Sequence, residues 1–220
     1  MSFADSILAT IAPRRMLAHP FYRAWEMGEL ELDVLKTYAR QYYHHVKAFP
    51  RYLSATHANC SDINSRRVLL ENLIDEEHGE TNHPELWLRF AEGIGNTRVE
   101  AELEELQPGT RALIDTFMRL ARSSYAEGLG ALFAYEQQIP AVAHTKADGL
   151  RKFYGVADER TVSYFTLHEE VDVHHSAATR KLIDELPAED RARALRAAEE
   201  VSEALWGFLD GMQAIRPVVQ

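Results

Sequence analysis

The sequence predicts an all-α fold. Apolar residues recur at helical spacing through most of the 220 residues, and no stretch shows the alternation typical of a strand. Glycine and proline number only 11 and 8, and they fall mostly between the helical segments. A chain of this length can bury one core, so we expect a single domain over residues 1–220.

Helices are expected wherever the helical spacing continues between these breaks. They cover residues 3–17, 21–27, 32–59, 64–82, 84–93, 98–104, 110–139, 140–154, 159–185 and 188–214. Pro50 and Pro140 lie inside helical stretches, where a missing N–H bends or breaks the axis. Pro187 precedes acidic residues, as at a helix start. Long helices with short connections predict a compact bundle.

Composition and charge narrow the possible partners. A net charge of −10 argues against nucleic acid, which needs clustered Lys and Arg. No apolar run approaches the roughly 20 residues of a spanning helix, and Arg14-Arg15 lacks the apolar segment of an export signal. The lone Cys60 cannot form an internal disulfide, in agreement with a reducing compartment. We therefore expect a soluble, cytoplasmic protein without membrane contact.

One segment, residues 164–175, places ligand-type side chains on one helical face. His168, Asp172 and His175 fall within about 60° of one another on an otherwise apolar stripe. Burying an ionised carboxylate and two imidazoles costs several kcal/mol unless a cation compensates. Two histidines with one carboxylate also match a non-heme iron site. A solvated or salt-bridged face is the alternative.

A second segment carries Glu76 and His83 on one stripe. The two residues are seven positions apart, and two helical turns separate their Cα atoms by about 10 Å along the axis, too far for easy chelation of one ion but suited to flanking two. Alternatively, Glu76 is one surface acid in the run 75–77.

A third segment, within residues 110–139, carries Glu136 as the lone charged member of a buried face. Glu136 either bridges two metals or pairs with a buried Arg or Lys. The three segments together supply three histidines and three carboxylates, a set that suits two metal ions. Nitrogen and oxygen ligands without thiolate are typical of iron or manganese redox sites in helical bundles, although charge alone does not exclude zinc.

Several long segments resemble one known family. They are residues 19–25, 42–55, 75–83, 135–140 and 168–175. The chain resembles, over nearly its whole length, the CADD family of heme-oxygenase-like diiron oxidases, relatives of PqqC and of the TenA thiaminases. This resemblance implies a heme-oxygenase-like helical bundle. It also implies that the metal ligands are Glu76, His83, Glu136, His168, Asp172 and His175.

The resemblance further implies an activity. Members of this family make p-aminobenzoate for folate synthesis, using the ring of one of their own tyrosines in a single turnover. The matching positions are Tyr22 for the ring, Lys146 for the amino group, and Tyr135 as a relay of oxidation. Two redox metals (Fe/Fe or Mn/Fe), O2, an external reductant and a homodimer are implied as well. Without the resemblance, Tyr22 is interpreted as a core aromatic residue and Lys146 as a solvated charge.

Three other functions are compatible with the sequence. A PqqC-like oxidase would act on a diffusible small molecule over many turnovers. An interaction protein would bind death domains, although the sequence offers no large unexplained apolar stripe for that role. A TenA-like hydrolase would need Cys60 as its nucleophile, and a buried structural cysteine is the simpler interpretation of that residue.

Overall fold

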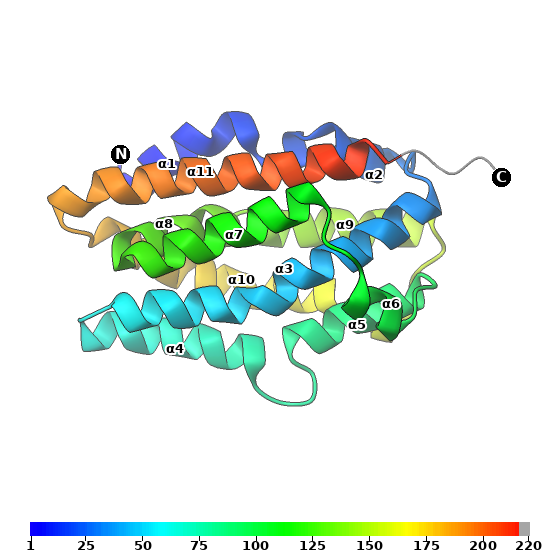
Figure 1. The fold of residues 1–220 in the computed structure, drawn as a ribbon, viewed down its shortest axis with the longest axis horizontal. Coiled ribbons are helices and arrows are strands. Elements are labelled where there is room, and N and C mark those ends of the chain that lie inside the picture. The colour runs from blue at the N-terminus through cyan, green and yellow to red at the C-terminus, as the bar shows by residue number, and fades with distance from the viewer. Residues whose placement is uncertain (216–220) are drawn as a thin grey trace.

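The computed structural model describes residues 1–215, except the side chains of residues 169–174, and shows an all-α bundle (Figure 1). The expected fold class is confirmed, and no strand occurs in the described part of the chain. The elements are α1 (Phe3–Ile11), η1 (Ala12–Arg14), η2 (Met16–Ala18), α2 (Pro20–Met27), α3 (Leu32–Asn59), α4 (Ile63–Glu77), α5 (His83–Gly93), α6 (Arg98–Leu103), α7 (Pro108–Ser123), α8 (Tyr125–Glu136), α9 (Ile139–Phe153), α10 (Glu159–Asp184) and α11 (Ala188–Gln213).

Most helices begin at polar capping side chains. Ser2 and Thr97 form capping boxes at α1 and α6, and Asp62 and Asp158 accept a backbone N–H at the starts of α4 and α10. Each cap satisfies a backbone donor that the first helical turn leaves unpaired. Pro187 stands at the N-cap of α11, as the sequence predicts.

Three expected helices end early or divide. The helix expected over residues 3–17 ends at Ile11, because Pro13 lacks the N–H that would continue it, and two 3-10 turns follow. The helix expected over residues 110–139 divides at Ser124, whose backbone is extended (φ −162°) and whose side chain caps α8. The helix expected over residues 64–82 stops at Glu77.

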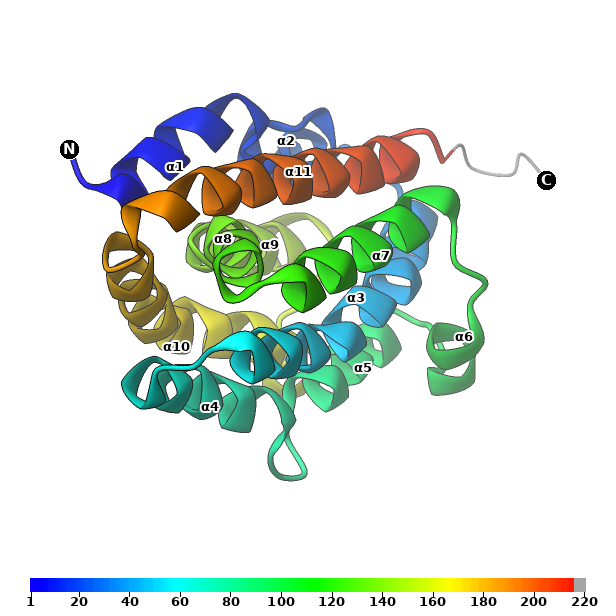
Figure 2. The same cartoon turned by 60° about the vertical axis from the view of Figure 1, so that its left-hand side comes forward.

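Helices α8 and α9 pass through the middle of the bundle. Figure 2 shows them surrounded by α11, α7, α3 and α10. Nearly every residue of α8 is buried, in agreement with this central place. The bundle thus positions the end of α8 at its centre.

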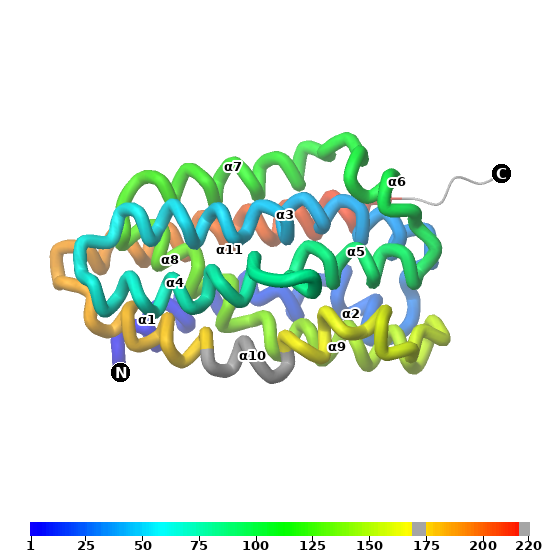
Figure 3. Tube along the Cα trace, turned by 90° about the horizontal axis from the view of Figure 1, so that it is seen from below, coloured from blue at the N-terminus to red at the C-terminus, as the bar shows by residue number. Residues whose placement is uncertain are grey.

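Helices α4 and α5 follow one another along the same side of α3 (Figure 3). Both contact α3 and α10. The connection over residues 77–81 is exposed, while Glu76 and His83 on either side of it are buried. Among the described residues, no helix is both long enough and apolar enough to cross a membrane.

Candidate metal centre and its tyrosine-lysine pocket

The junction between α4 and α5 brings Glu76 and His83 together. Glu76 lies in the last turn of α4 and His83 is the first residue of α5. The chain turns between them at Gly79, whose φ of 85° suits glycine, and Asn82 then caps α5. Glu76 Oε2 and His83 Nδ1 are 2.7 Å apart. The 10 Å separation expected for a continuous helix is therefore wrong, because the helix ends at Glu77.

His168 joins this pair from α10. Its Nδ1–H donates to the carbonyl oxygen of Tyr164 at 2.6 Å, which directs the lone pair of the ring to Nε2. The rings of His83 and His168 are 4.4 Å apart. One ligand atom each from Glu76, His83 and His168 lies within 4.8 Å of the other two, and all three residues are buried.

A cavity of about 10 Å³ lies beside these residues. Its lining residues are Val46, Phe49, Glu76, Tyr135, Glu136, Ile139, Tyr164 and His168. This volume admits about one water-sized occupant. Two carboxylates and an imidazole around so small a space form a donor set that suits a divalent redox metal, because the cation offsets the cost of burying the carboxylates.

Glu136, the last residue of α8, has both carboxylate oxygens engaged. Its Oε1 accepts from Asn72 Nδ2 at 2.6 Å, and its Oε2 lies 2.9 Å from the hydroxyl donor Thr179 Oγ1. The side chain is 3% exposed. The donors at these two oxygens are an amide and a hydroxyl, whereas the sequence suggested a buried Arg or Lys as the alternative to a metal.

The other two expected ligands lie elsewhere or outside the described residues. His175 Nε2 contacts Asp75 Oδ2 at 2.9 Å and is not in the group formed by Glu76, His83 and His168. Asp172 belongs to the side chains that the structure does not describe. The six-residue ligand set therefore stays a prediction, with three members gathered and Glu136 beside them.

A second buried cluster surrounds Lys146, on α9. Its side chain is 3% exposed, so its interpretation as a solvated charge is wrong. Its Nζ lies 5.5 Å from the ring centroid of Tyr22 and 4.8 Å from that of Tyr42. The rings of Tyr38, Trp87 and Phe165 lie at 5.2, 5.2 and 5.7 Å. We call these five rings and the lysine the lysine cage.

Two opposing effects act on the amino group in this cage. Removal from water lowers the pKa of Lys146 well below its usual value. The aromatic faces attract an ammonium ion and act in the opposite direction. The neighbouring rings carry no full negative charge to hold the proton, and burial shifts Lys146 toward the neutral amine.

Helices α2 and α9 approach closely enough to place Tyr22 beside Lys146. Trp25 Nε1 donates to the carbonyl oxygen of Lys146 at 3.3 Å. A Cβ at Gly149 would lie 2.6 Å from Trp25 Cδ1, so only glycine permits this approach.

A row of tyrosines connects the cage to the small cavity. Tyr135, which lines the cavity, shares a 2.7 Å hydrogen bond with the hydroxyl of Tyr42. Tyr42 stacks on Tyr38 at 5.3 Å between centroids. The hydroxyls of Tyr38 and Tyr22 share a hydrogen bond of 3.0 Å. Burial is the main reason that the pKa values of Tyr22, Tyr38 and Tyr135 lie above the usual range.

Sequence reasoning missed Tyr38, Tyr42 and the buried His45. Their spacing of four and three residues places them on one face of α3, a signal that the sequence does contain. Neither ring nitrogen of His45 has a hydrogen-bond partner among the described residues. Burial, and secondarily Lys146, lowers the pKa of His45 to about 3, so this ring is neutral beside Tyr42 and Tyr135.

Known proteins are similar to this chain in sequence and in fold. A family model for an iron-containing redox enzyme matches residues 36–206. A 4-aminobenzoate synthase of Chlamydia muridarum is 44% identical over 211 residues, which cover 96% of this chain and 89% of that protein. A pyrroloquinoline-quinone synthase of Klebsiella pneumoniae is 26% identical over 200 residues, with coverage of 88% and 79%.

A solved structure of a TenA homologue from P. horikoshii superposes with a TM-score of 0.79 at 19% identity, covering 96% of this chain and 98% of that one. The resemblance identified from the sequence is thereby confirmed at the level of family and fold. The chain belongs to the family of iron-containing redox enzymes and has a TenA-type, heme-oxygenase-like bundle.

Proposed function

We propose that this chain is an O2-dependent 4-aminobenzoate (p-aminobenzoate) synthase that uses its own Tyr22 as the ring source and Lys146 as the amino donor. The observation that carries this proposal is the lysine cage, where the amine lies 5.5 Å from the Tyr22 ring centroid in a buried pocket. The similarity to 4-aminobenzoate synthases over 96% of the chain supports the same reaction.

The metals would be held by Glu76, His83, Glu136, His168, Asp172 and His175. Two ions, Fe/Fe or Mn/Fe, would supply the oxidising power of O2, with electrons from an external reductant. The hydrogen bonds to Glu136 and His168 fix the orientation of these side chains before a metal binds, as outer-shell partners do in metal sites.

The protein's own tyrosines would carry the oxidation outward. Tyr135 lines the cavity, and its hydrogen bond to Tyr42 offers a short path for a proton when either hydroxyl is oxidised. Tyr38 continues the row to Tyr22. The buried rings exclude water, which would otherwise quench an oxidised tyrosine.

At Tyr22, the Cα–Cβ bond would break and Cβ would become the carboxylate of the product. Oxygen and electrons would come from O2 and the reductant. Lys146 Nζ would condense with the ring carbon that bears the oxygen once Tyr22 is oxidised to the ketone level, and the phenolic oxygen would leave as water. A shift of the C=N bond to Cε and hydrolysis would then break the Nζ–Cε bond, which leaves the nitrogen on the ring and an aldehyde at Cε of residue 146. A neutral amine has the lone pair that a new C–N bond requires, and the cage favours that form.

A PqqC-like oxidase with a diffusible substrate is the competing function. The cavity beside the candidate metal ligands holds about 10 Å³, which has no room for a free aromatic molecule. Tyr22 needs no such room because it is already part of the protein. This difference favours a single self-sacrificing reaction and disfavours an enzyme that turns over a free substrate many times.

Isotope labelling tests the proposal directly. Protein made with ring-13C tyrosine and 15N lysine is loaded with metal without oxygen, then exposed to O2 and a reductant. We expect 4-aminobenzoate that carries both labels, at no more than one equivalent per chain. Lys152, an exposed lysine on the same helix, provides the control, because Lys152→Arg leaves the yield unchanged while Lys146→Arg abolishes it.

Sustained formation of product beyond one equivalent, or unlabelled product, would refute the self-sacrificing reaction.

A cytoplasmic homodimer built from single domains is the assembly we propose for the enzyme. Light scattering on the purified protein measures its mass and tests the dimer.

A further inference from the structure

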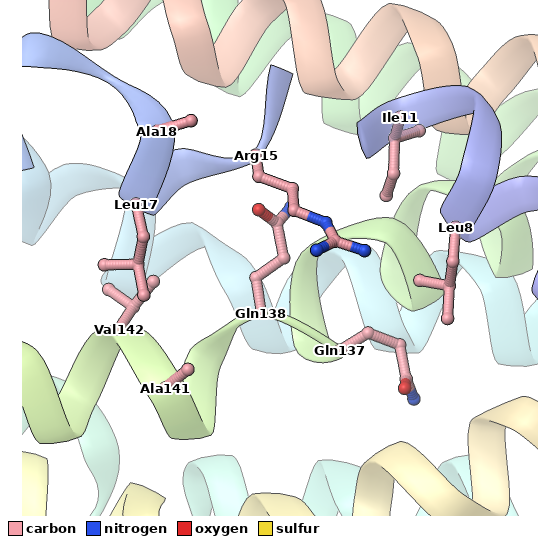
Figure 4. Close-up of a pocket in the computed structure, with 9 residues that line it drawn as sticks. All are labelled: Leu8, Ile11, Arg15, Leu17, Ala18, Gln137, Gln138, Ala141 and Val142. Carbon is pink, nitrogen blue, oxygen red and sulfur yellow. The ribbon is translucent and has the colours of Figure 1, made fainter. Parts of the chain in front are cut away.

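A separate pocket of about 460 Å³ opens between the N-terminal segment and the junction of α8 with α9 (Figure 4). Its lining residues are Leu8, Ile11, Arg15, Leu17, Ala18, Gln137, Gln138, Ala141 and Val142. The volume is in the range that small-molecule sites occupy. The pocket shares no lining residue with the cavity at the candidate metal centre.

Arg15 is the one charged residue among the lining side chains, and its guanidinium extends toward the middle of the pocket (Figure 4). Within the described part of the chain, Arg15 has no ion-pair or side-chain hydrogen-bond partner, whereas its neighbour Arg14 pairs with Glu203. Arg15 is exposed, and its unpaired guanidinium can bind an anion although the net charge of −10 opposes anion binding.

The remaining walls define the rest of the ligand. Six of the lining residues are aliphatic, and both glutamines already use their amide nitrogens. Gln137 donates to the carbonyl of Ser176, and Gln138 donates to the carbonyl of Ala134 and accepts from the backbone N–H of Met16. One cation above apolar walls fits a molecule with an apolar body and a single carboxylate.

The position of the pocket relates it to the lysine cage. Leu17 and Ala18 lie in η2, four to five residues before Tyr22, and Val142 lies one helical turn before Lys146. The two segments that carry the reacting side chains therefore also form walls of this pocket. We propose that the pocket binds a small apolar carboxylate and, if the proposed function holds, receives 4-aminobenzoate as it leaves the cage.

Calorimetric titration of the metal-loaded full-length protein, kept without oxygen, tests this site. We expect 4-aminobenzoate and benzoate to bind at one site per chain, and aniline, which lacks the carboxylate, not to bind. Arg15→Gln is expected to weaken binding about 10-fold or more through the lost charge-assisted hydrogen bonds. The adjacent Arg14→Gln serves as the matched control and leaves the affinity within about 2-fold.

A second variant tests the location. Ala141 is exposed at the pocket, so Ala141→Trp fills the space with little risk to folding, which circular dichroism checks, and is expected to abolish binding. Unchanged affinity in both Arg15→Gln and Ala141→Trp, equal binding of aniline, or no binding because a second copy covers the pocket would overturn the proposal. The titration does not depend on product formation, so its failure and a failed labelling experiment are distinguishable.

Discussion

The two buried polar regions of this molecule are built in opposite ways. At the candidate metal centre, carboxylates and imidazoles contact one another and nearby hydrogen-bond donors, as in the 2.7 Å contact between Glu76 and His83. In the lysine cage, one amine is surrounded by five aromatic rings without a carboxylate among them. The first arrangement attracts a cation. The second disfavours the charged form of Lys146.

This difference indicates a division of work within one bundle. A site for metal needs concentrated negative charge, whereas an amine that forms a C–N bond needs its lone pair. If the metal-binding carboxylates and the amine of Lys146 shared one polar pocket, the carboxylates would keep the lysine protonated. The row Tyr135, Tyr42, Tyr38 and Tyr22 lets the two environments remain separate while staying connected.

Removing His168 is expected to have the largest effect. His168→Ala deletes one of the three gathered ligands and leaves Glu76 buried without that partner, so metal content falls well below the two ions per chain expected otherwise. No 4-aminobenzoate forms. Elemental analysis and product assay measure the two effects. His78→Ala, at an exposed histidine just after α4, is the control and retains both metal and product; full metal content in His168→Ala would contradict the proposed centre.

Replacing Lys146 tests the opposite region. Lys146→Met abolishes product but leaves the metal content unchanged, because the side chain belongs to the cage alone. The lowered pKa means that the unfolded chain binds a proton that the folded chain lacks, so stability rises with pH until about 10.4. The variant loses this rise and is expected to be more stable than the original chain at pH 7, because no amine has to be buried.

Denaturant unfolding at pH 7 and pH 9 measures the change. Lys152→Met, at an exposed lysine paired with Asp148, is expected to keep the same change in unfolding free energy between the two pH values as the original chain. If Lys146→Met left this pH dependence unaltered, the amine would have to stay charged in the folded protein. The cage would then not supply the neutral amine that the reaction needs.

These contrasts also mark what the sequence could predict. Helical spacing predicted the fold class and placed Glu136 on a buried face, because burial follows from periodicity along a single helix. It misplaced Glu76 relative to His83, because a turn at Gly79 brings their side chains together across a helix break. Spacing along the chain carries no information about such an approach.

The lysine cage was less predictable still. Lys146 precedes Ala147, Asp148 and Gly149, a polar context that suggests solvent, and its burial depends on five rings from other helices. Only the resemblance to a family singled it out. Tyr38 and Tyr42 were detectable as a helical stripe, yet a stripe of aromatic residues is usually core, and their hydroxyl contacts require the packed structure to be seen.

The link between the two regions gives the smallest expected effect. Tyr42→Phe removes the hydroxyl that bonds Tyr135 while keeping the ring stacked on Tyr38, so the metal centre and the cage both stay assembled. We expect full metal content, a loss of about 1 kcal/mol in stability from the broken hydrogen bond, and product formation slowed about 10-fold or more. Rapid mixing with O2 and denaturant unfolding measure the last two.

Tyr52→Phe is the matched control, since Tyr52 lies on the same helix, is buried, and its hydroxyl has no hydrogen-bond partner among the described residues. Its removal is expected to change stability by less than about 0.5 kcal/mol and to leave the rate unaltered. Equal rates in Tyr42→Phe and Tyr52→Phe would show that oxidation reaches Tyr22 without the hydroxyl of Tyr42. The stacked rings alone would then connect the metal centre to the cage, and the hydrogen bond to Tyr135 would contribute only to core packing.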